Sequence, residues 1–351
     1  MRTDGPVLVV GGGIVGLCVA HYLTTAGVEV EVAERATLAS GASWGNAGWV
    51  CLSHSTPVPF PGVARYGLRS LGRPDAPLYL RPSADPRFVA WLWRLWRSSG
   101  EAAFRRGYAA IADLNRPTFA LYDGLAGAGV DTTLRRPGLV HAFLSEVEAA
   151  HHLATQRIMA AGRYDLPDDI VVGEAAHGLD PALGPHVRAA YLVRGEGVVD
   201  PRRLVESLAG VVREAGGKIH EHVEVRGFHG TAGRIGAAVT STGEIPCSAV
   251  VIAGGMWSHR LLRHLGYRLP LQAGKGYSFT VPLPDPPRRA LYLGEHRVVA
   301  GALRAAARPA RPGGPRRAAR STSASPGSWR RRAAPRPGWP GRWSSAATTA
   351  G

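Results

Sequence analysis

The chain has 351 residues, 45% of them hydrophobic, which is ordinary for a soluble globular enzyme and long enough for two domains. Its net charge of +16 is concentrated at one end, because residues 301–351 hold eleven arginines and no acid. The first 300 residues carry only 16 − 11 = +5, so charge gives no reason to expect a nucleic-acid-binding body.

Cysteine content and the length of the apolar runs indicate the cellular compartment. Cys18, Cys51 and Cys247 form no Cys-x-x-Cys pair and predict no disulfide framework, so a reducing compartment is expected. No signal peptide is evident before the first apolar run, and no uninterrupted apolar run approaches membrane-spanning length. We expect a cytoplasmic protein, with peripheral contact at the inner face of the cell membrane left open.

The N-terminal segment predicts a phosphate-binding strand–turn–helix unit. The uncharged run Val7–Val10 is followed by Gly-x-Gly-x-x-Gly at residues 11–16 and by an amphipathic segment to Ala26. Gly11 allows the tight turn, Gly13 lets the backbone approach a pyrophosphate, and Gly16 lets helix and strand pack closely. The alternative is a glycine-rich turn of another α/β protein.

A second strand completes this unit. Gly27 ends the helix and residues 28–32 alternate as a strand, after which Glu34 stands where a carboxylate accepts hydrogen bonds from ribose hydroxyls. Glu34 could instead be a solvated charge at a strand end. The order of the parts, near the expected spacing, predicts a dinucleotide site.

The next loop, residues 39–48, consists mostly of small residues and carries the first specific resemblance. Its Gly-Ala-Ser and Asn-Ala-Gly, at residues 41–43 and 46–48, resemble the flavin-binding amino-acid oxidoreductases of the D-amino-acid oxidase superfamily, glycine oxidase included. Within it the chain is most similar to bacterial D-amino-acid dehydrogenases. The resemblance implies that this loop runs along the FAD pyrophosphate and under the flavin ring. A flexible surface loop is the alternative.

A second glycine motif lies about 240 residues further on and favours FAD over NAD. Residues 249–258 read as strand, glycine turn and helix start, similar to the family's second glycine motif. Before it, residues 218–225 alternate as a strand, in which Val223 matches a valine whose backbone holds the adenine ring in the family. A core role for Val223 is compatible with this.

The resemblance and the motifs together name the residues expected to contact the cofactor. They are Gly11, Gly13, Ile14, Val15, Gly16, Glu34, Arg35, Ala42, Ser43, Asn46, Ala47, Gly48, Val223, Ala253, Gly254 and Gly255. For substrate binding, Tyr277 lies in Lys-Gly-Tyr-Ser, similar to a family strand at residues 275–281. It could present its phenol to a substrate carboxylate, although any strand points half its residues inward. No catalytic residue is identified.

Between the two halves the pattern predicts mostly helices. Residues 55–84, rich in proline and arginine, predict an extended surface connection. Asp85-Pro86 begins a tryptophan-rich helix to Arg97, for which we favour a core position over a membrane-surface position. Residues 101–129 and 146–161 predict further helices, with a strand at 139–144 between them.

Histidine pairs invite a metal-site interpretation, which we discount. His151-His152 are adjacent, and His220 and His222 would share one strand face. No third ligand lies at a recognisable spacing, so no metal is expected.

The predicted fold is α/β, a discontinuous FAD-binding Rossmann-like domain with an inserted α+β substrate domain. The predicted FAD-binding domain comprises residues 1–55 and 195–270, and the substrate domain residues 56–194 and 271–300. Residues 301–351 are 38 parts Ala, Arg, Pro and Gly of 51, which predicts a disordered tail. The resemblance ends near Val299, so the family's C-terminal segment is expected to be missing or frameshifted.

The resemblance implies FAD-dependent oxidation of a D-amino acid: a hydride passes from Cα to flavin N5 and the imino acid is hydrolysed. The expected partners are an amino-acid substrate and an electron acceptor, either a quinone of the respiratory chain or O2. Activity could be impaired by loss of the C-terminal segment. Alternatives are a sarcosine, glycine or hydroxyproline oxidoreductase, or a nonfunctional truncated product. A basic tail that binds nucleic acid nonspecifically is less favoured, and no specific nucleic-acid partner is expected.

Overall fold

The computed structural model describes residues 5–70, 83–160, 163–231, 233–295 and 298–301. The described residues belong to one compact unit, Met1–Arg304, and residues 305–351 lie outside the described residues. The expected disorder of the tail therefore stays a prediction, as do the limits of the two predicted domains.

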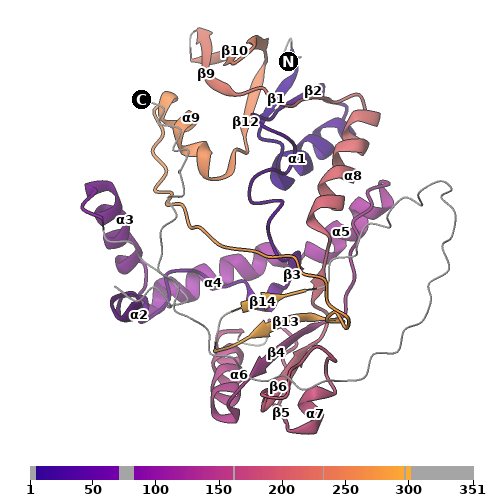
Figure 1. Cartoon of the computed structure of the whole chain (residues 1–351). Coiled ribbons are helices and arrows are strands. Elements are labelled where there is room, and N and C mark those ends of the chain that lie inside the picture. The colour runs from indigo at the N-terminus through magenta and orange to yellow at the C-terminus, as the bar shows by residue number, and fades with distance from the viewer. Residues whose placement is uncertain (1–4, 71–82, 161–162, 232, 296–297, 302–351) are drawn as a thin grey trace, which may run out of the picture. The chain divides into compact units, whose positions relative to one another are not determined.

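The predicted strand–helix–strand unit is confirmed, and it lies in a four-stranded parallel sheet of order β12-β1-β2-β8. Figure 1 shows β12, β1 and β2 of this sheet together with α1. Its strands are β1 (Val7–Val10), β2 (Val30–Ala33), β8 (Lys218–His220) and β12 (Ala249–Ile252). The uncharged sequence of β1 suits its central position, because a parallel sheet is normally covered by helices on both faces.

Two helices pack together beside this sheet: α1 (Ile14–Thr25) and α8 (Pro201–Glu214). Leu17 of α1 lies in one buried cluster with Leu204 and Leu208 of α8. Asp200 caps α8 by accepting hydrogen bonds from the backbone N–H groups of Arg202 and Arg203.

A second sheet has five strands in the order β14-β13-β4-β6-β5. They are β4 (Leu139–Phe143), β5 (Val171–Val172), β6 (Ala189–Val193), β13 (Ala290–Leu293) and β14 (Val298–Ala300). Helix α6 (Glu146–Ala160) packs on it through Ala149 and Leu153, and α7 (Glu174–His177) through Ala176. The predicted strand at 139–144 and helix at 146–161 are thus confirmed.

The remaining strands form two small antiparallel sheets. One pairs β3 (Trp49–Val50) with β7 (Gly197–Val198), and the other consists of β9 (Val225–Thr231), β10 (Arg234–Thr240) and β11 (Gly243–Pro246). The remaining helices are α2 (Val63–Ser70), α3 (Pro86–Arg97), α4 (Glu101–Asn115), α5 (Thr118–Gly127) and α9 (Ser258–His264), with the helical turns η1 (Leu52–His54) and η2 (Gly255–Trp257).

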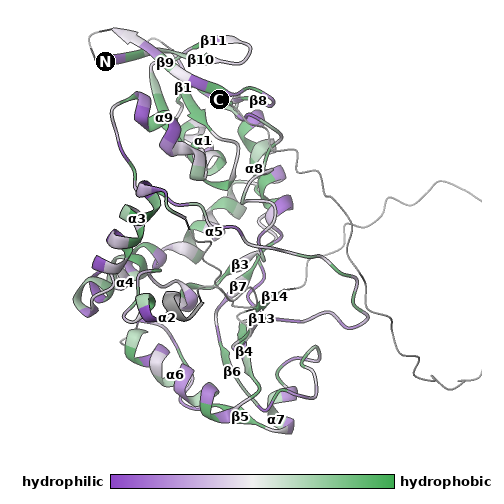
Figure 2. Cartoon of the chain, turned by 60° about the vertical axis from the view of Figure 1, so that its left-hand side comes forward, coloured by the Kyte–Doolittle hydropathy of each residue, from purple (hydrophilic) through white to green (hydrophobic). Residues whose placement is uncertain are grey.

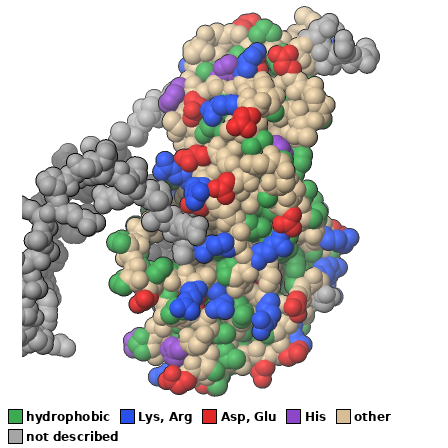
Figure 3. Space-filling model, turned by 90° about the vertical axis from the view of Figure 1, so that its right-hand side faces the viewer, with side chains coloured by type: hydrophobic (Ala, Val, Ile, Leu, Met, Phe, Trp, Pro, Cys, Tyr) green, Lys and Arg blue, Asp and Glu red, His purple; other side chains and the backbone are tan. Residues whose placement is uncertain are grey.

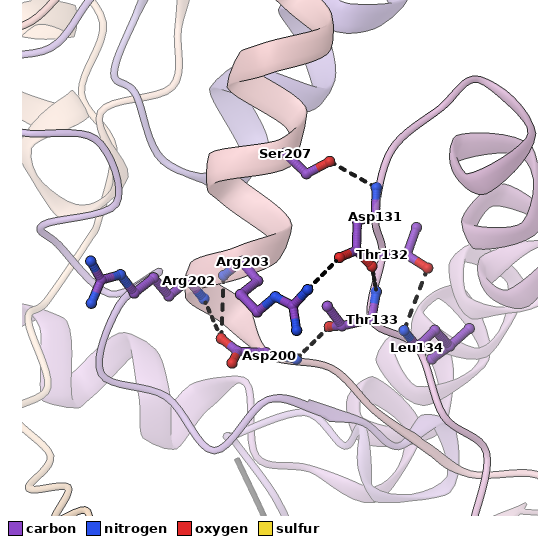
Figure 4. A network of polar contacts seen from close by, with 8 residues as sticks. All are labelled: Asp131, Thr132, Thr133, Leu134, Asp200, Arg202, Arg203 and Ser207. Carbon is purple, nitrogen blue, oxygen red and sulfur yellow. Dashed lines mark hydrogen bonds and ion pairs between the residues drawn. The ribbon is translucent and has the colours of Figure 1, made fainter. Parts of the chain in front are cut away.

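A polar network joins the segment before β4 to the first turn of α8 (Figure 4). Arg203 pairs with Asp131 at 2.8 Å, and the Asp131 backbone N–H donates to the Ser207 hydroxyl at 2.7 Å. The Asp200 backbone N–H donates to the Thr133 hydroxyl at 2.7 Å. These contacts fix where α8 begins, and α8 lies against the helix of the glycine motif.

Three predicted elements are wrong in extent. The helix predicted over 101–129 is two helices, because Pro117 lacks the N–H that an uninterrupted helix needs. The strand predicted over 218–225 ends at His220, since His222 takes a positive φ of 62°. The extended connection predicted for 55–84 contains α2; its residues 71–82 lie outside the described residues.

Two predictions about packing are also wrong. Helix α3 begins at Pro86 behind its Asp85 cap as predicted, yet none of its residues is buried. No strand forms over 275–281: this segment is irregular, and Tyr277 and Phe279 are 79% and 86% exposed. The alternating pattern is present there, but no ladder partner is found within the described residues.

Candidate cofactor and substrate site

The structure brings the two glycine turns together at the carboxyl edge of the parallel sheet. β1 and β12 pair in register, Val10 opposite Ile252, so Gly11 follows one strand beside Ala253 after the other. A Cβ on Gly11, whose φ is +116°, would lie 2.6 Å from the Ala253 carbonyl oxygen. A Cβ on Gly16 would lie 1.9 Å from the Gly11 carbonyl oxygen. Only glycine fits this close packing.

Glu34 ends β2 next to the first glycine turn. Its carboxylate accepts hydrogen bonds from the backbone N–H groups of Gly12 at 2.8 Å and Ala36 at 3.0 Å. A carboxylate has about four acceptor positions, so two remain for ribose hydroxyls. The Val223 N–H donates to the Glu34 carbonyl at 2.9 Å, which brings the predicted adenine-side valine to the same edge.

The loop of small residues folds on itself and against the glycine motif. Its Ser43 hydroxyl accepts from the Ile14 N–H at 3.0 Å, where α1 begins. The Asn46 side chain accepts from the Gly48 N–H at 2.8 Å and donates to the carbonyls of Ala42 and Ser43. Gly48 has φ +67°, and a Cβ there would lie 2.1 Å from the Val199 carbonyl oxygen. These contacts give the loop a defined shape, which the alternative of a flexible loop does not predict.

The other residues predicted to contact the cofactor lie next to those already described. Val15 is 64% exposed in the first turn of α1, Arg35 follows Glu34, and Ala47 precedes Gly48. Gly254 and Gly255 form the second turn, where Gly255 takes φ +55°. Tyr277 is the exception: its exposed ring lies near the Lys275 ammonium group, at 5.3 Å, and lines neither cavity described below.

Two adjoining cavities continue from the loop, with volumes of about 270 Å³ and 120 Å³. The smaller is lined by residues of the cofactor loop, Ser43, Asn46 and Gly48, and by α8. The larger is lined by residues 49–52, 54 and 55 and by Asn115, Thr118 and Tyr122. Trp49 and Tyr122 line both cavities, so they lie where the two adjoin.

A buried carboxylate holds the turn that forms one wall of the larger cavity. Glu196, 4% exposed, accepts hydrogen bonds from the backbone N–H groups of Leu52 at 2.6 Å and Ser53 at 2.9 Å. Burial raises the pKa of Glu196, and hydrogen bonds from Ser53 and Leu52 oppose that shift. His54, the last residue of this turn, is thereby set at the cavity wall.

Histidine and tyrosine rings cluster between this turn and the second sheet. His141 of β4 is fully buried, stacks on Tyr191 at 4.5 Å between ring centroids, and lies 5.7 Å from His54. Neither ring nitrogen of His141 has a hydrogen-bond partner within the described part of the chain. Burial lowers the pKa of His54 and, with the nearby His152 and His54, lowers the pKa of His141 well below its ordinary value.

We expect His141 to make the fold acid-labile. Because the folded-state pKa is depressed, its contribution to stability is complete above the unfolded-state pKa of about 6.5 and is lost as pH falls below that value. His141→Phe keeps a stacked ring and removes the charge, so urea unfolding should show a smaller stability loss between about pH 7.5 and 5.5.

The surface variant His151→Phe is the control for this experiment. His151 lies exposed on α6 and should leave the acid-induced loss of stability unchanged. An acid-induced loss as large in His141→Phe as in the parent chain would contradict the role of His141.

No group of three or more His, Cys, Asp or Glu side chains suited to a metal ion occurs within the residues that the structure describes. The His220 imidazole instead contacts the Glu31 carboxylate at 2.9 Å, and the His152 imidazole contacts the Tyr191 hydroxyl at 2.6 Å. These two imidazoles, which the histidine spacing alone suggested as metal ligands, thus contact a carboxylate and a hydroxyl of the chain itself.

Sequence patterns missed the buried polar residues of this site. Glu196 stands between two glycines before a strand, a weak sign of a special turn, while His141 reads as an ordinary strand residue. Their partners lie far away in sequence, such as Leu52 for Glu196, 144 positions away. Trp257 reads in the sequence as part of a helix start.

The two glycine turns, the Glu34 carboxylate and the loop at residues 39–48 lie together at one edge of the parallel sheet. This arrangement is typical of a binding site for a flavin or nicotinamide dinucleotide. The chain matches the DAO family model, described as FAD dependent oxidoreductase, over residues 6–332. It therefore belongs to this family of FAD-dependent enzymes. The match runs 332 − 299 = 33 residues past Val299, where the motifs that we recognise end.

Several curated relatives of the chain are D-amino acid dehydrogenases. The chain is 32% identical over 288 residues to a D-amino acid dehydrogenase of Methylobacterium sp. (strain 4-46), covering 80% of this chain and 67% of the relative. A D-amino acid dehydrogenase of Neisseria meningitidis serogroup C (strain 053442) is 30% identical over 288 residues, which cover 80% of this chain and 68% of the relative.

Solved structures share the fold. Glycine oxidase from Geobacillus kaustophilus superposes with a TM-score of 0.52 at 24% identity, over 75% of this chain and 58% of that one. L-amino acid deaminase from Proteus myxofaciens gives 0.52 at 24% identity, over 84% of this chain and 56% of that one. The chain thus spans about two thirds of the curated relatives and less than three fifths of the solved structures.

Proposed function

We propose that the chain is an FAD-dependent oxidoreductase that oxidises a D-amino acid. The observation that carries the proposal is the pair of glycine turns at one edge of the parallel sheet, with Glu34 between them and the cofactor loop against α1. The curated relatives favour a D-amino acid over other amines. FAD, when bound, supplies the hydride acceptor for oxidation of the amine to an imine, which water hydrolyses.

The chain's own residues would bind and orient. Gly11, Gly13 and Gly16 admit the pyrophosphate, Glu34 accepts from the ribose, and Ser43 and Asn46 shape the loop against which the flavin would lie. The larger cavity begins at Trp49, directly after this loop, and no charged side chain is among its lining residues in the described structure. It suits an uncharged part of the substrate, contacted by His54, Asn115 and Tyr122.

The test is the visible spectrum of the purified chain after incubation with FAD and desalting, followed by anaerobic D-alanine. Retained flavin bands that bleach with D-alanine support the proposal. Retained flavin that bleaches with sarcosine, glycine or hydroxyproline, and with no D-amino acid, would replace it with another amine oxidoreductase. Failure to hold flavin would identify a nonfunctional product. The electron acceptor, a quinone or O2, is then found by adding each to the reduced protein.

We also propose peripheral membrane contact through α3. The exposed fractions are 53% for Val89, 52% for Trp93 and 60% for Trp96, and hydrophilic and hydrophobic residues alternate along the helix (Figure 2). Three arginines and no acid occupy it, and Arg97 lies over the Trp93 ring at 5.3 Å. Tryptophan prefers the membrane interface and arginine the headgroups. No described helix is long and apolar enough to cross a membrane.

Binding to vesicles of anionic phosphatidylglycerol should exceed binding to phosphatidylcholine and should fall in Trp93→Ala/Trp96→Ala. Leu114→Ala, an apolar residue 78% exposed on α4, is the matched control. Equal vesicle binding by both variants would exclude α3 as the contact.

For nucleic acid we propose no role: on the face in Figure 3, Lys and Arg side chains are interspersed with Asp and Glu. The arginine-rich tail lies outside the described residues.

A further inference from the structure

The larger cavity is lined by aromatic rings and has room for a further ring. Its volume of about 270 Å³ exceeds the roughly 150 Å³ of an apolar cavity that binds benzene. Trp49 of β3, His54 of η1 and Tyr122 of α5 all line it. The rings of Trp49 and His54 meet edge to face, with centroids 5.6 Å apart and planes at 82°. Aromatic rings pair well in this geometry, so these walls suit an aromatic guest.

Charge restricts which part of a substrate this cavity can hold. No charged side chain is among the described residues that line it. Burial lowers the pKa of His54, so its imidazole is also neutral at neutral pH. An ionised group placed here would lose hydration without gaining a charged partner, which is costly. The carboxylate and ammonium groups of an amino acid therefore do not belong in this cavity, whereas an uncharged side chain does.

Two uncharged polar side chains line the cavity where α4 is followed by α5. Asn115 is the last residue of α4, and Thr118 is the first residue of α5. The Asn115 amide nitrogen donates to the Tyr164 hydroxyl at 3.4 Å, which leaves the amide oxygen as an acceptor. Thr118 lies four residues before Tyr122, on the same face of α5. A hydroxyl group of the guest can therefore form hydrogen bonds close to a ring that contacts Tyr122.

The rings and the polar groups differ in their distribution over the two cavities. Trp49 and Tyr122 also line the smaller cavity, beside the cofactor loop, whereas Asn115 and Thr118 line only the larger one. An amino acid with its reacting carbon toward the cofactor loop would extend its side chain past the rings of Trp49 and Tyr122. The far end of that side chain would then reach Asn115 and Thr118.

We propose that the larger cavity binds the side chain of an aromatic amino acid, and that Asn115 and Thr118 select a phenol over an unsubstituted ring. The D configuration and the oxidation rest on the proposed function, but recognition of the ring does not depend on them. The preferred substrate class is a D-amino acid with a p-hydroxyphenyl side chain. Selectivity arises because an unsubstituted ring would displace water from the two polar groups without replacing its hydrogen bonds.

The test is a ligand-observed NMR titration of the full chain, with and without FAD, using probes of the side chain alone. p-Cresol has both ring and hydroxyl, toluene has the ring, and 4-methylcyclohexanol has the hydroxyl. p-Cresol should bind about three- to tenfold more tightly than either of the other two. In flavin-loaded protein, kcat/KM should be highest for D-tyrosine, lower for D-phenylalanine and lowest for D-alanine.

Three variants separate the ring from the hydroxyl. Asn115→Leu should remove most of the preference for p-cresol over toluene, and the nearly isosteric Thr118→Val should remove part of it. Tyr122→Leu should weaken p-cresol and toluene alike, about three- to tenfold, and keep their ratio. Tyr22→Leu, which removes an exposed ring of α1 that lines neither cavity, is the matched control.

Equal binding of p-cresol and 4-methylcyclohexanol, or no p-cresol binding by the parent chain, would overturn the proposal. An unchanged preference for p-cresol over toluene in both Asn115→Leu and Thr118→Val would do the same. Loss of p-cresol binding when FAD is bound would show that the cofactor ring fills the cavity, which also overturns it. A higher kcat/KM for D-alanine than for D-tyrosine rejects the side-chain class and leaves the proposed function intact. Flavin-loaded protein that binds p-cresol but oxidises no D-amino acid rejects the proposed function alone.

Discussion

Gly16→Ala is expected to abolish flavin retention and to lower the free energy of unfolding by about 1–3 kcal/mol or more. The added Cβ would stand 1.9 Å from the Gly11 carbonyl oxygen and 3.4 Å from the Ala253 Cβ. Neither neighbour is a flexible side-chain end, so helix α1 would have to separate from both glycine turns. Urea unfolding measures the stability change, and the flavin spectrum after desalting measures retention.

Gly210→Ala is the matched control. Gly210 lies inside α8, and an added Cβ there would meet no atom within 4 Å. Alanine is the better helix former by about 1 kcal/mol, so this variant should be neutral or more stable and should keep flavin. Parent-level flavin retention by Gly16→Ala would show that the turn tolerates a side chain and that the cradle is not built as described.

The cofactor half of the fold follows largely from local sequence. Its strand, turn and helix at residues 7–26 are adjacent, and each carries its own signal: an uncharged run, spaced glycines and an amphipathic stretch. The register that places Gly11 beside Ala253 could not be read from spacing, because it depends on pairing between strands about 240 residues apart. The family resemblance supplied that link.

The errors have physical causes. A helix that is apolar around most of its circumference is usually buried, but the arginines at positions 87, 94 and 97, seven and three residues apart, give α3 a polar face, and no neighbour covers it within the described structure. Residues 275–281 have the alternation of a strand, but a strand needs a partner for its backbone groups, which local sequence cannot supply. Between α4 and α5 the sequence does carry a signal for the break, because Pro117 cannot donate the backbone hydrogen bond that a continuous helix needs.

Glu196→Ala is expected to lower the free energy of unfolding by about 2–5 kcal/mol, because the Leu52 and Ser53 N–H groups would lose their acceptor in a buried place. Each unsatisfied buried group costs about 1–3 kcal/mol, more when its lost partner was charged. Urea unfolding measures the loss. Glu196→Gln keeps one amide oxygen as acceptor and turns an N–H donor toward the other group, so its stability should fall between those of the parent and Glu196→Ala.

Glu206→Ala separates this effect from loss of a negative charge. Glu206 pairs with Arg202 at 2.8 Å on the surface of α8, and its side chain is 57% exposed. Such pairs contribute only about 0–1 kcal/mol. A similar loss in Glu206→Ala and Glu196→Ala would mean that charge, and not the two buried hydrogen bonds, holds the turn. A larger loss of stability in Glu196→Ala, together with weaker substrate binding by its flavin-loaded form, would show that the turn held by Glu196 also sets the position of His54 at the larger cavity.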